Sequence, residues 1–68
     1  MDKATETALR AILNGLHLSG GLSEDQMASV VRELEDAAAT CAAEDYPVEA
    51  AELRRLARGI TQDALEAH

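Results

Sequence analysis

The sequence predicts an all-α protein, either a three-helix bundle or a helical hairpin with an extra helix, whose core is completed by dimerisation. Apolar residues recur at steps of three and four in three segments, which is the spacing of one helix face. β-Branched residues never alternate with polar ones over a useful length, so strands are not expected. We therefore expect helices at about residues 3–18, 24–43 and 47–66 of a single small domain, residues 1–68.

The first helix is expected to begin near residue 2. Lys3, Glu6 and Arg10 have the spacing of ion pairs, and we place them on the outer face. The inward seam follows steps of four and three, with Leu13 beside it: Thr5, Leu9, Ile12 and Leu16.

The second helix has the clearest start. Ser23 is followed three residues later by Gln26, which is the arrangement of a reciprocal capping box. Glu24 and Asp25 place negative charge on the first turn, where the helix dipole favours it. The seam again follows heptad spacing, with Val30 widening it: Met27, Val31, Leu34, Ala38, Cys41 and Asp45.

The third helix is expected to begin at Pro47, because proline suits a first helical turn that needs no backbone N–H donor. Either Asp45 or Tyr46 is expected to be its N-cap. The inward residues are Val48, Leu53, Leu56, Ile60 and Ala64, with Leu65 or Ala67 near the end.

Two glycines fall inside the expected helices. The first helix is predicted to continue through Gly15, because the Gly20-Gly21 pair is a stronger stop. Gly15 and Gly59 each lie twelve residues past the expected start of their helix. If the first and third helices run parallel, these two glycines are predicted to meet.

Size and charge limit the possible functions. A 68-residue chain with a single aromatic residue has a thin core, and we expect a second copy or a partner to complete it. A net charge of −7 disfavours direct binding to nucleic acid or to an anionic membrane. No apolar run is long enough to span a membrane. One cysteine and an N-terminus without an apolar leader indicate the cytoplasm.

No motif for catalysis, metal binding or cofactor binding is present. Cys41 lies on the seam of the second helix, where we interpret it as a small buried hydrophobic residue. His17 and His68 lack the spacing of a zinc site. The Gly20-Gly21 loop lacks the further glycines and the lysine of a phosphate-binding loop. We expect no enzyme and no cofactor.

Arg54, Arg55 and Arg58 form the only basic cluster. An arginine-bearing third helix is where a helix-turn-helix protein contacts DNA. With thirteen acidic residues against six basic ones, ion pairing with the acidic edge of the second helix or with a second subunit is the favoured interpretation.

Ser23 heads the second helix of a small acidic helical domain, which resembles in outline the acyl and peptidyl carrier proteins. That family carries its prosthetic arm on a serine in an Asp-Ser-Leu context. Here Ser23 lies between Leu22 and Glu24, so the modification is not carried over and Ser23 is interpreted as an N-cap.

The predicted function is a small non-enzymatic protein–protein interaction module that works as a homodimer or docks on a larger protein. Its expected contact seam comprises Met27, Val31, Leu34, Ala38, Cys41, Leu53, Leu56 and Ile60, with possible charged contacts at Arg54, Arg55, Arg58, Glu33, Glu35 and Asp36. The alternative is an acidic regulator that imitates nucleic-acid charge through Glu33, Glu35, Asp36, Glu44 and Asp45.

Overall fold

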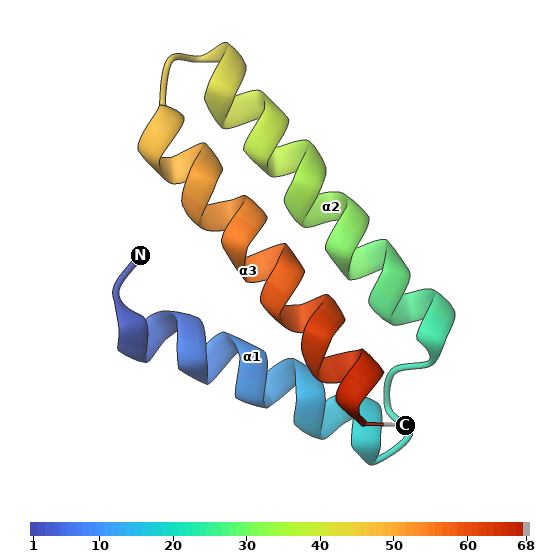
Figure 1. The fold of residues 1–68 in the computed structure, drawn as a ribbon. Helices are drawn as coiled ribbons and strands as arrows, with labels where there is room; N and C mark the ends of the chain where they lie inside the picture. Colours follow the sequence, from blue (N-terminus) through green and yellow to red (C-terminus); the bar gives the residue numbers. More distant parts are fainter. Residues whose placement is uncertain (68) are drawn as a thin grey trace.

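The computed structural model describes residues 1–67 and consists of three helices joined by two short turns. They are α1 (Lys3–Leu18), α2 (Glu24–Ala43) and α3 (Pro47–Glu66), as Figure 1 shows. The predicted all-α fold of three packed helices is therefore confirmed. Helices long and apolar enough to cross a membrane were not found in the part of the chain that the structure describes. His68, considered above as a metal ligand, lies outside that part.

The body of the molecule is the hairpin of α2 and α3, which lie side by side and antiparallel over most of their length (Figure 1). The first helix packs chiefly on α3 and makes little contact with α2. It runs in the same general direction as α3 but crosses it obliquely (Figure 1). The fold is thus a helical hairpin with a third helix attached to one side.

The core is small and lies mainly between α2 and α3. Its buried large side chains are Met27, Leu56 and Ile60. Partly buried apolar residues surround it: Leu13, Leu22, Val31 and Leu34. Buried alanines let the two helices approach closely: Ala38, Ala50 and Ala57. Because alanine contributes little apolar area, the burial that stabilises this fold is limited.

Local signals place the helix ends. The predicted capping box is present: the backbone N–H of Gln26 donates to Ser23 Oγ at 3.1 Å, and the Ser23 N–H donates to the Gln26 side chain at 2.8 Å. Gly20 adopts φ 84°, which the reversal between α1 and α2 requires. Tyr46 is the N-cap of α3, while Asp45 lies in the turn with φ 67° rather than on the seam of α2.

The inward face of α3 differs from the prediction at two positions. Val48 is 64% exposed and Leu65 is 66% exposed, whereas Ala50 and Ala57 are buried. The physical reason is that α3 approaches α2 through its small residues. Centring the contact on Ala57 turns Val48 and Leu65 toward solvent. Leu53, Leu56, Ile60 and Ala64 are half-buried or buried as expected.

Candidate functional site

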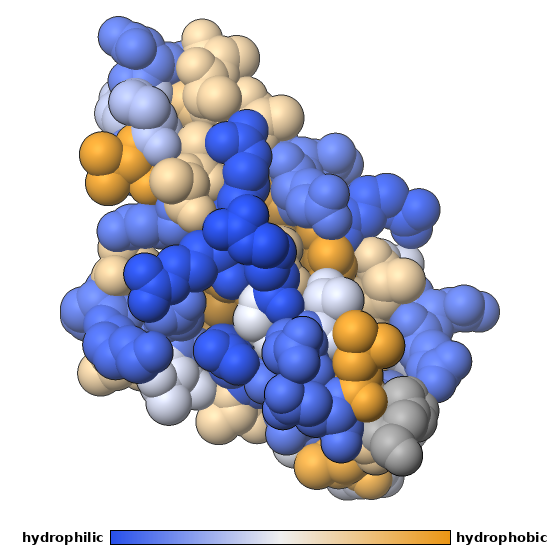
Figure 2. Space-filling view, in the orientation of Figure 1, coloured by the Kyte–Doolittle hydropathy of each residue, from blue (hydrophilic) through white to orange (hydrophobic). Residues whose placement is uncertain are grey.

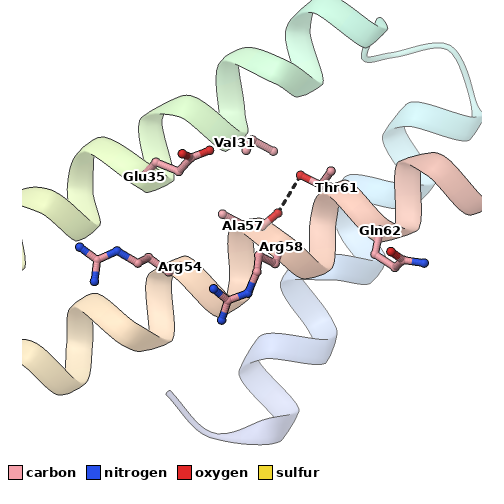
Figure 3. A pocket seen from close by; sticks show the side chains of 7 residues that line it. All are labelled: Val31, Glu35, Arg54, Ala57, Arg58, Thr61 and Gln62. Atoms are coloured by element: carbon pink, nitrogen blue, oxygen red, sulfur yellow. Dashed lines mark hydrogen bonds between the residues drawn. The ribbon is translucent and has the colours of Figure 1, made fainter.

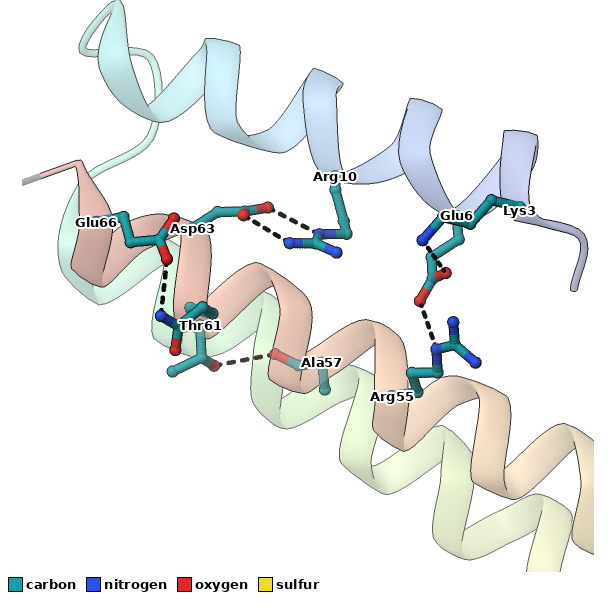
Figure 4. A network of polar contacts seen from close by, with 9 residues as sticks. Lys3, Glu6, Arg10, Arg55, Ala57, Thr61, Asp63 and Glu66 are labelled. Atoms are coloured by element: carbon teal, nitrogen blue, oxygen red, sulfur yellow. Dashed lines mark hydrogen bonds and ion pairs between the residues drawn. The ribbon is translucent and has the colours of Figure 1, made fainter.

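Ion pairs join α1 to α3 beside the apolar packing of Leu13 on the core. The Arg10 guanidinium donates two hydrogen bonds to the Asp63 carboxylate, Nε to Oδ2 at 2.9 Å and a terminal nitrogen to Oδ1 at 2.7 Å (Figure 4). These bonds stabilise both charged forms, so they lower the pKa of Asp63 and raise the pKa of Arg10. A bidentate pair of this kind fixes the position of one helix on another.

Glu6 makes a second polar link. It is only 8% exposed, and its carboxylate lies 3.2 Å from Arg55 Nε and 4.0 Å from Lys3 Nζ (Figure 4). The N-terminal amine also pairs with Glu52 on α3. The placement of Glu6 and Arg10 on the outer face of the first helix was therefore wrong. Both turn toward α3, because α3 supplies opposite charges at matching positions.

The apolar seam predicted for the first helix was wrong for the same reason. Leu9 is 37% exposed, Leu16 is 45% exposed and Ile12 is 59% exposed. Thr5 is exposed as well. Glu6, Arg10 and Leu13 are turned toward α3. Each residue of the predicted seam comes one position before one of these inward positions or before His17, so it is rotated by about 100° around the helix and points away from α3. We call these four residues the large row of α1.

A second row lies beside the large row and consists of small residues at the same heptad steps, namely Ala4, Ala8, Ala11 and Gly15, all of them exposed. We call it the small row. Together the two rows form the outer face of α1, which carries no charged side chain. The ionisable residues of this helix, Lys3, Glu6, Arg10 and His17, lie toward α3 or at the edge of that contact.

The expected contact between Gly15 and Gly59 was wrong. Both helices continue through their glycine. A Cβ atom on Gly59 would lie 2.9 Å from Arg10 Nε, so the end of the Arg10 side chain reaches Gly59. Gly15 has no such neighbour within 4 Å and faces outward. The partner of Gly59 is therefore the Arg10 side chain rather than Gly15, because α1 presents its charged side to α3.

The predicted contact seam lies between the helices of this chain. Met27, Ala38, Leu56 and Ile60 are buried, and Val31, Leu34, Cys41 and Leu53 are half-buried. These residues pack α2 against α3, so little of their surface remains for another molecule.

The predicted charged contacts do not gather on one surface. Arg55 pairs with Glu6 of α1, not with α2. Arg54 and Arg58 line an open groove between α2 and α3 together with Glu35 (Figure 3). Within residues 1–67, neither of these two arginines has an ion pair shorter than 4.0 Å. Figure 2 shows hydrophilic side chains gathered over the middle of this view of the molecule, with apolar atoms nearer its margins.

The acidic residues of the alternative function are exposed on α2 and in the turn after it: Glu33, Glu35, Asp36, Glu44 and Asp45. Glu33 and Glu35 are two residues apart on one helix, so their side chains point about 160° away from each other. Carboxylates that spread around a helix do not form the single row that a phosphate backbone presents.

An apolar groove of about 370 Å³ opens where α1 ends, between the start of α2 and the end of α3. Met27, Ile60 and Leu65 supply apolar walls, and His17 and Glu24 also line the groove. The His17 ring is oriented by a contact of 3.0 Å between Nδ1 and the Leu22 carbonyl oxygen. His17 thus helps to hold the turn that joins α1 to α2.

Cys41 and His17 lie at opposite ends of α2. Cys41 is half-buried near the last turn, about 20 Å along the helix from Met27, beside which His17 lies. The structure therefore does not bring the thiol and the imidazole together. No cluster of three or more metal-ligating side chains occurs among residues 1–67.

The chain matches no known protein family, no curated protein and no solved structure. Sequence reasoning missed the outer face of α1 as a candidate surface. The signal for it was available: every charged residue of this helix falls on one side, leaving an uncharged arc of roughly half the circumference.

Proposed function

We propose that this chain is a non-enzymatic protein–protein interaction module that recognises an apolar helix through the outer face of α1. The observation that carries the proposal is the orientation of α1. A surface helix usually turns its charges to water and its apolar residues to the core. This helix does the reverse: Arg10 and Glu6 face α3, while Ile12 and Leu16 face solvent.

A partner that docks on this face removes its exposed apolar side chains from water, which favours binding. Each 100 Å² of apolar surface removed from water is worth about 2.5 kcal/mol before the costs of association. Exposed apolar residues scattered singly need no explanation, but a continuous apolar patch marks an interaction site. The large and small rows are adjacent along the whole of α1 and form such a patch.

A helix is the partner structure that suits this face. Large side chains at heptad steps are the knobs of helix pairing, and the neighbouring small residues let a second backbone come close. A charged peptide or a nucleic acid is a poor fit, because the face offers no charge to pair with.

The non-enzymatic assignment rests on how the polar side chains are used. The closest polar groups are joined into ion pairs between α1 and α3, where they hold the two helices together: Arg10 with Asp63, and Glu6 with Arg55. Such pairs position a helix and leave no free acid or base at that contact.

Site-specific photo-crosslinking in the cells that express the protein tests the proposal. A photoreactive side chain at Ala11, on the outer face of α1, is expected to form a crosslinked protein adduct. The same side chain at Ala39, exposed on α2, is the matched control and is expected to form much less. Equal adduct yields at the two positions, or no adduct at Ala11, would contradict the proposed function.

A further inference from the structure

We infer that the helix recognised by the outer face of α1 is α1 of a second copy, so that two chains form a homodimer with α1 packed on α1. This inference rests on the proposed function and names the partner. It is carried by the distribution of charge over the chain, by the pattern of the two rows and by the small core.

The distribution of charge favours a second copy. The chain carries −7, and the exposed surface of α2 holds acidic residues such as Glu33 and Asp36. A contact of α2 on α2 brings these carboxylates of the two copies together. The outer face of α1 bears no charge and points away from α3, so pairing through it leaves both hairpins on the outside.

The distance between those hairpins limits their repulsion. Two stacked α1 helices, each about 10 Å across, hold the hairpins about 20 Å apart. The Debye length at physiological ionic strength is about 8 Å, so charges separated by that distance are largely screened. Self-association through α1 therefore has a small electrostatic cost despite the acidic chain.

The two rows make the face complementary to itself. A two-fold axis parallel to α1 places the large row of one copy over the small row of the other, at the same level along the helix. Ile12 and Leu9 then fill the spaces above Ala8 and Ala11 of the second copy. The small residues accept large side chains without a gap, which is the requirement of close helix packing.

The thin core supplies an independent reason. Within the described residues, only three large apolar side chains are buried, Met27, Leu56 and Ile60. Chains of this length usually need a further source of burial, and oligomerisation is one of them. A contact through one helix is small, so we expect a dissociation constant in the micromolar range.

Sedimentation equilibrium of the purified full chain tests the inference. The parent is expected to dimerise, and Ala8→Glu is expected to raise the dissociation constant at least tenfold by placing a carboxylate in the dry centre of the contact. Ala39→Glu adds the same charge on α2 and is expected to change the constant less than threefold. Ala8 is exposed in the single chain, so its variant should keep the helical circular dichroism of the parent. Ile12→Ser is a second variant that removes apolar area without adding charge, and it should also dissociate.

A parent that stays monomeric at several hundred micromolar overturns the inference. A dimer that Ala8→Glu and Ile12→Ser leave intact overturns it as well, because the contact then lies elsewhere. The inference about the second copy can fail while the proposed function stands. If the purified chain is monomeric but Ala11 still crosslinks in cells to a different protein, the face is an interaction surface whose partner is not a second copy.

Discussion

Replacing Gly59 by alanine tests how tightly α1 is held against α3. In a helix interior, Gly→Ala stabilises by about 0.5–1 kcal/mol, because alanine loses less backbone entropy on folding. At Gly59 the new Cβ would lie 2.9 Å from Arg10 Nε and 3.0 Å from both Cδ and Cζ. Distances this short require the Arg10 side chain to move.

Moving Arg10 weakens its paired hydrogen bonds to Asp63. These side chains are 32% and 20% exposed, so the pair is partly screened and contributes about 1 kcal/mol. The gain in helix propensity and the loss of the ion pair then nearly cancel. We expect Gly59→Ala to leave the free energy of unfolding unchanged or to lower it.

Gly15→Ala is the matched control, because that glycine is also inside a helix and has no neighbour within 4 Å of its added Cβ. It should gain the full 0.5–1 kcal/mol, and 1 kcal/mol corresponds to a rise in melting temperature of about 4–8 °C for a domain of this size. In an Arg10→Ala background, Gly59→Ala should show the same gain.

Circular dichroism melts and urea titrations measure all of these variants, at protein concentrations low enough that the melting temperature no longer depends on concentration. The reasoning is refuted if Gly59→Ala stabilises the parent as much as Gly15→Ala does. It is also refuted if the effect of Gly59→Ala is the same with and without Arg10, because the two positions are then not coupled.

Three further predictions follow from single contacts. Leu56→Ala should cost about 2–5 kcal/mol in urea unfolding, since Leu56 is 2% exposed, and it should cost more than Leu34→Ala, because Leu34 is only half-buried. Asp63 has a lowered pKa in the folded chain, so the stability that it contributes is present above its unfolded pKa of about 3.9 and is lost as the pH falls through the folded value. In melts recorded from pH 5 downward, the melting temperature of Asp63→Asn should therefore fall less with decreasing pH than that of the parent. An equal fall in the two proteins would show that Asp63 does not contribute to the acid sensitivity. Ser23→Ala should destabilise by about 1 kcal/mol because it removes the capping hydrogen bond to the Gln26 N–H, and a melting temperature equal to that of the parent would argue against that role.

The helix ends and the seam of α2 were predictable from the sequence because they depend on short-range chemistry. Ser23 and Gln26 satisfy each other's backbone partners within one turn, and Pro47 suits a first helical turn wherever it occurs. Met27 and Ala38 lie on the side of α2 that carries its large apolar residues, so the heptad spacing predicted the buried face of this helix correctly. The close packing of α3 through its alanines was harder to predict from the sequence. Ala50 and Ala57 are buried and Val48 is exposed, because steric fit as well as hydrophobicity determines which face of α3 contacts α2.

The sequence by itself determined where the three helices begin and end, because caps and turns act within a few residues. Only the tertiary structure decided which side of α1 faces inward. Two seams with heptad spacing run along that helix, an apolar one through Leu9 and Ile12 and a mixed one through Glu6 and Arg10. Periodicity favours the apolar seam, but the mixed seam finds Asp63 and Arg55 on α3. Arg10 and Asp63 are 53 residues apart, and a pattern read over one helix contains no information about a charge that the fold brings from so far along the chain.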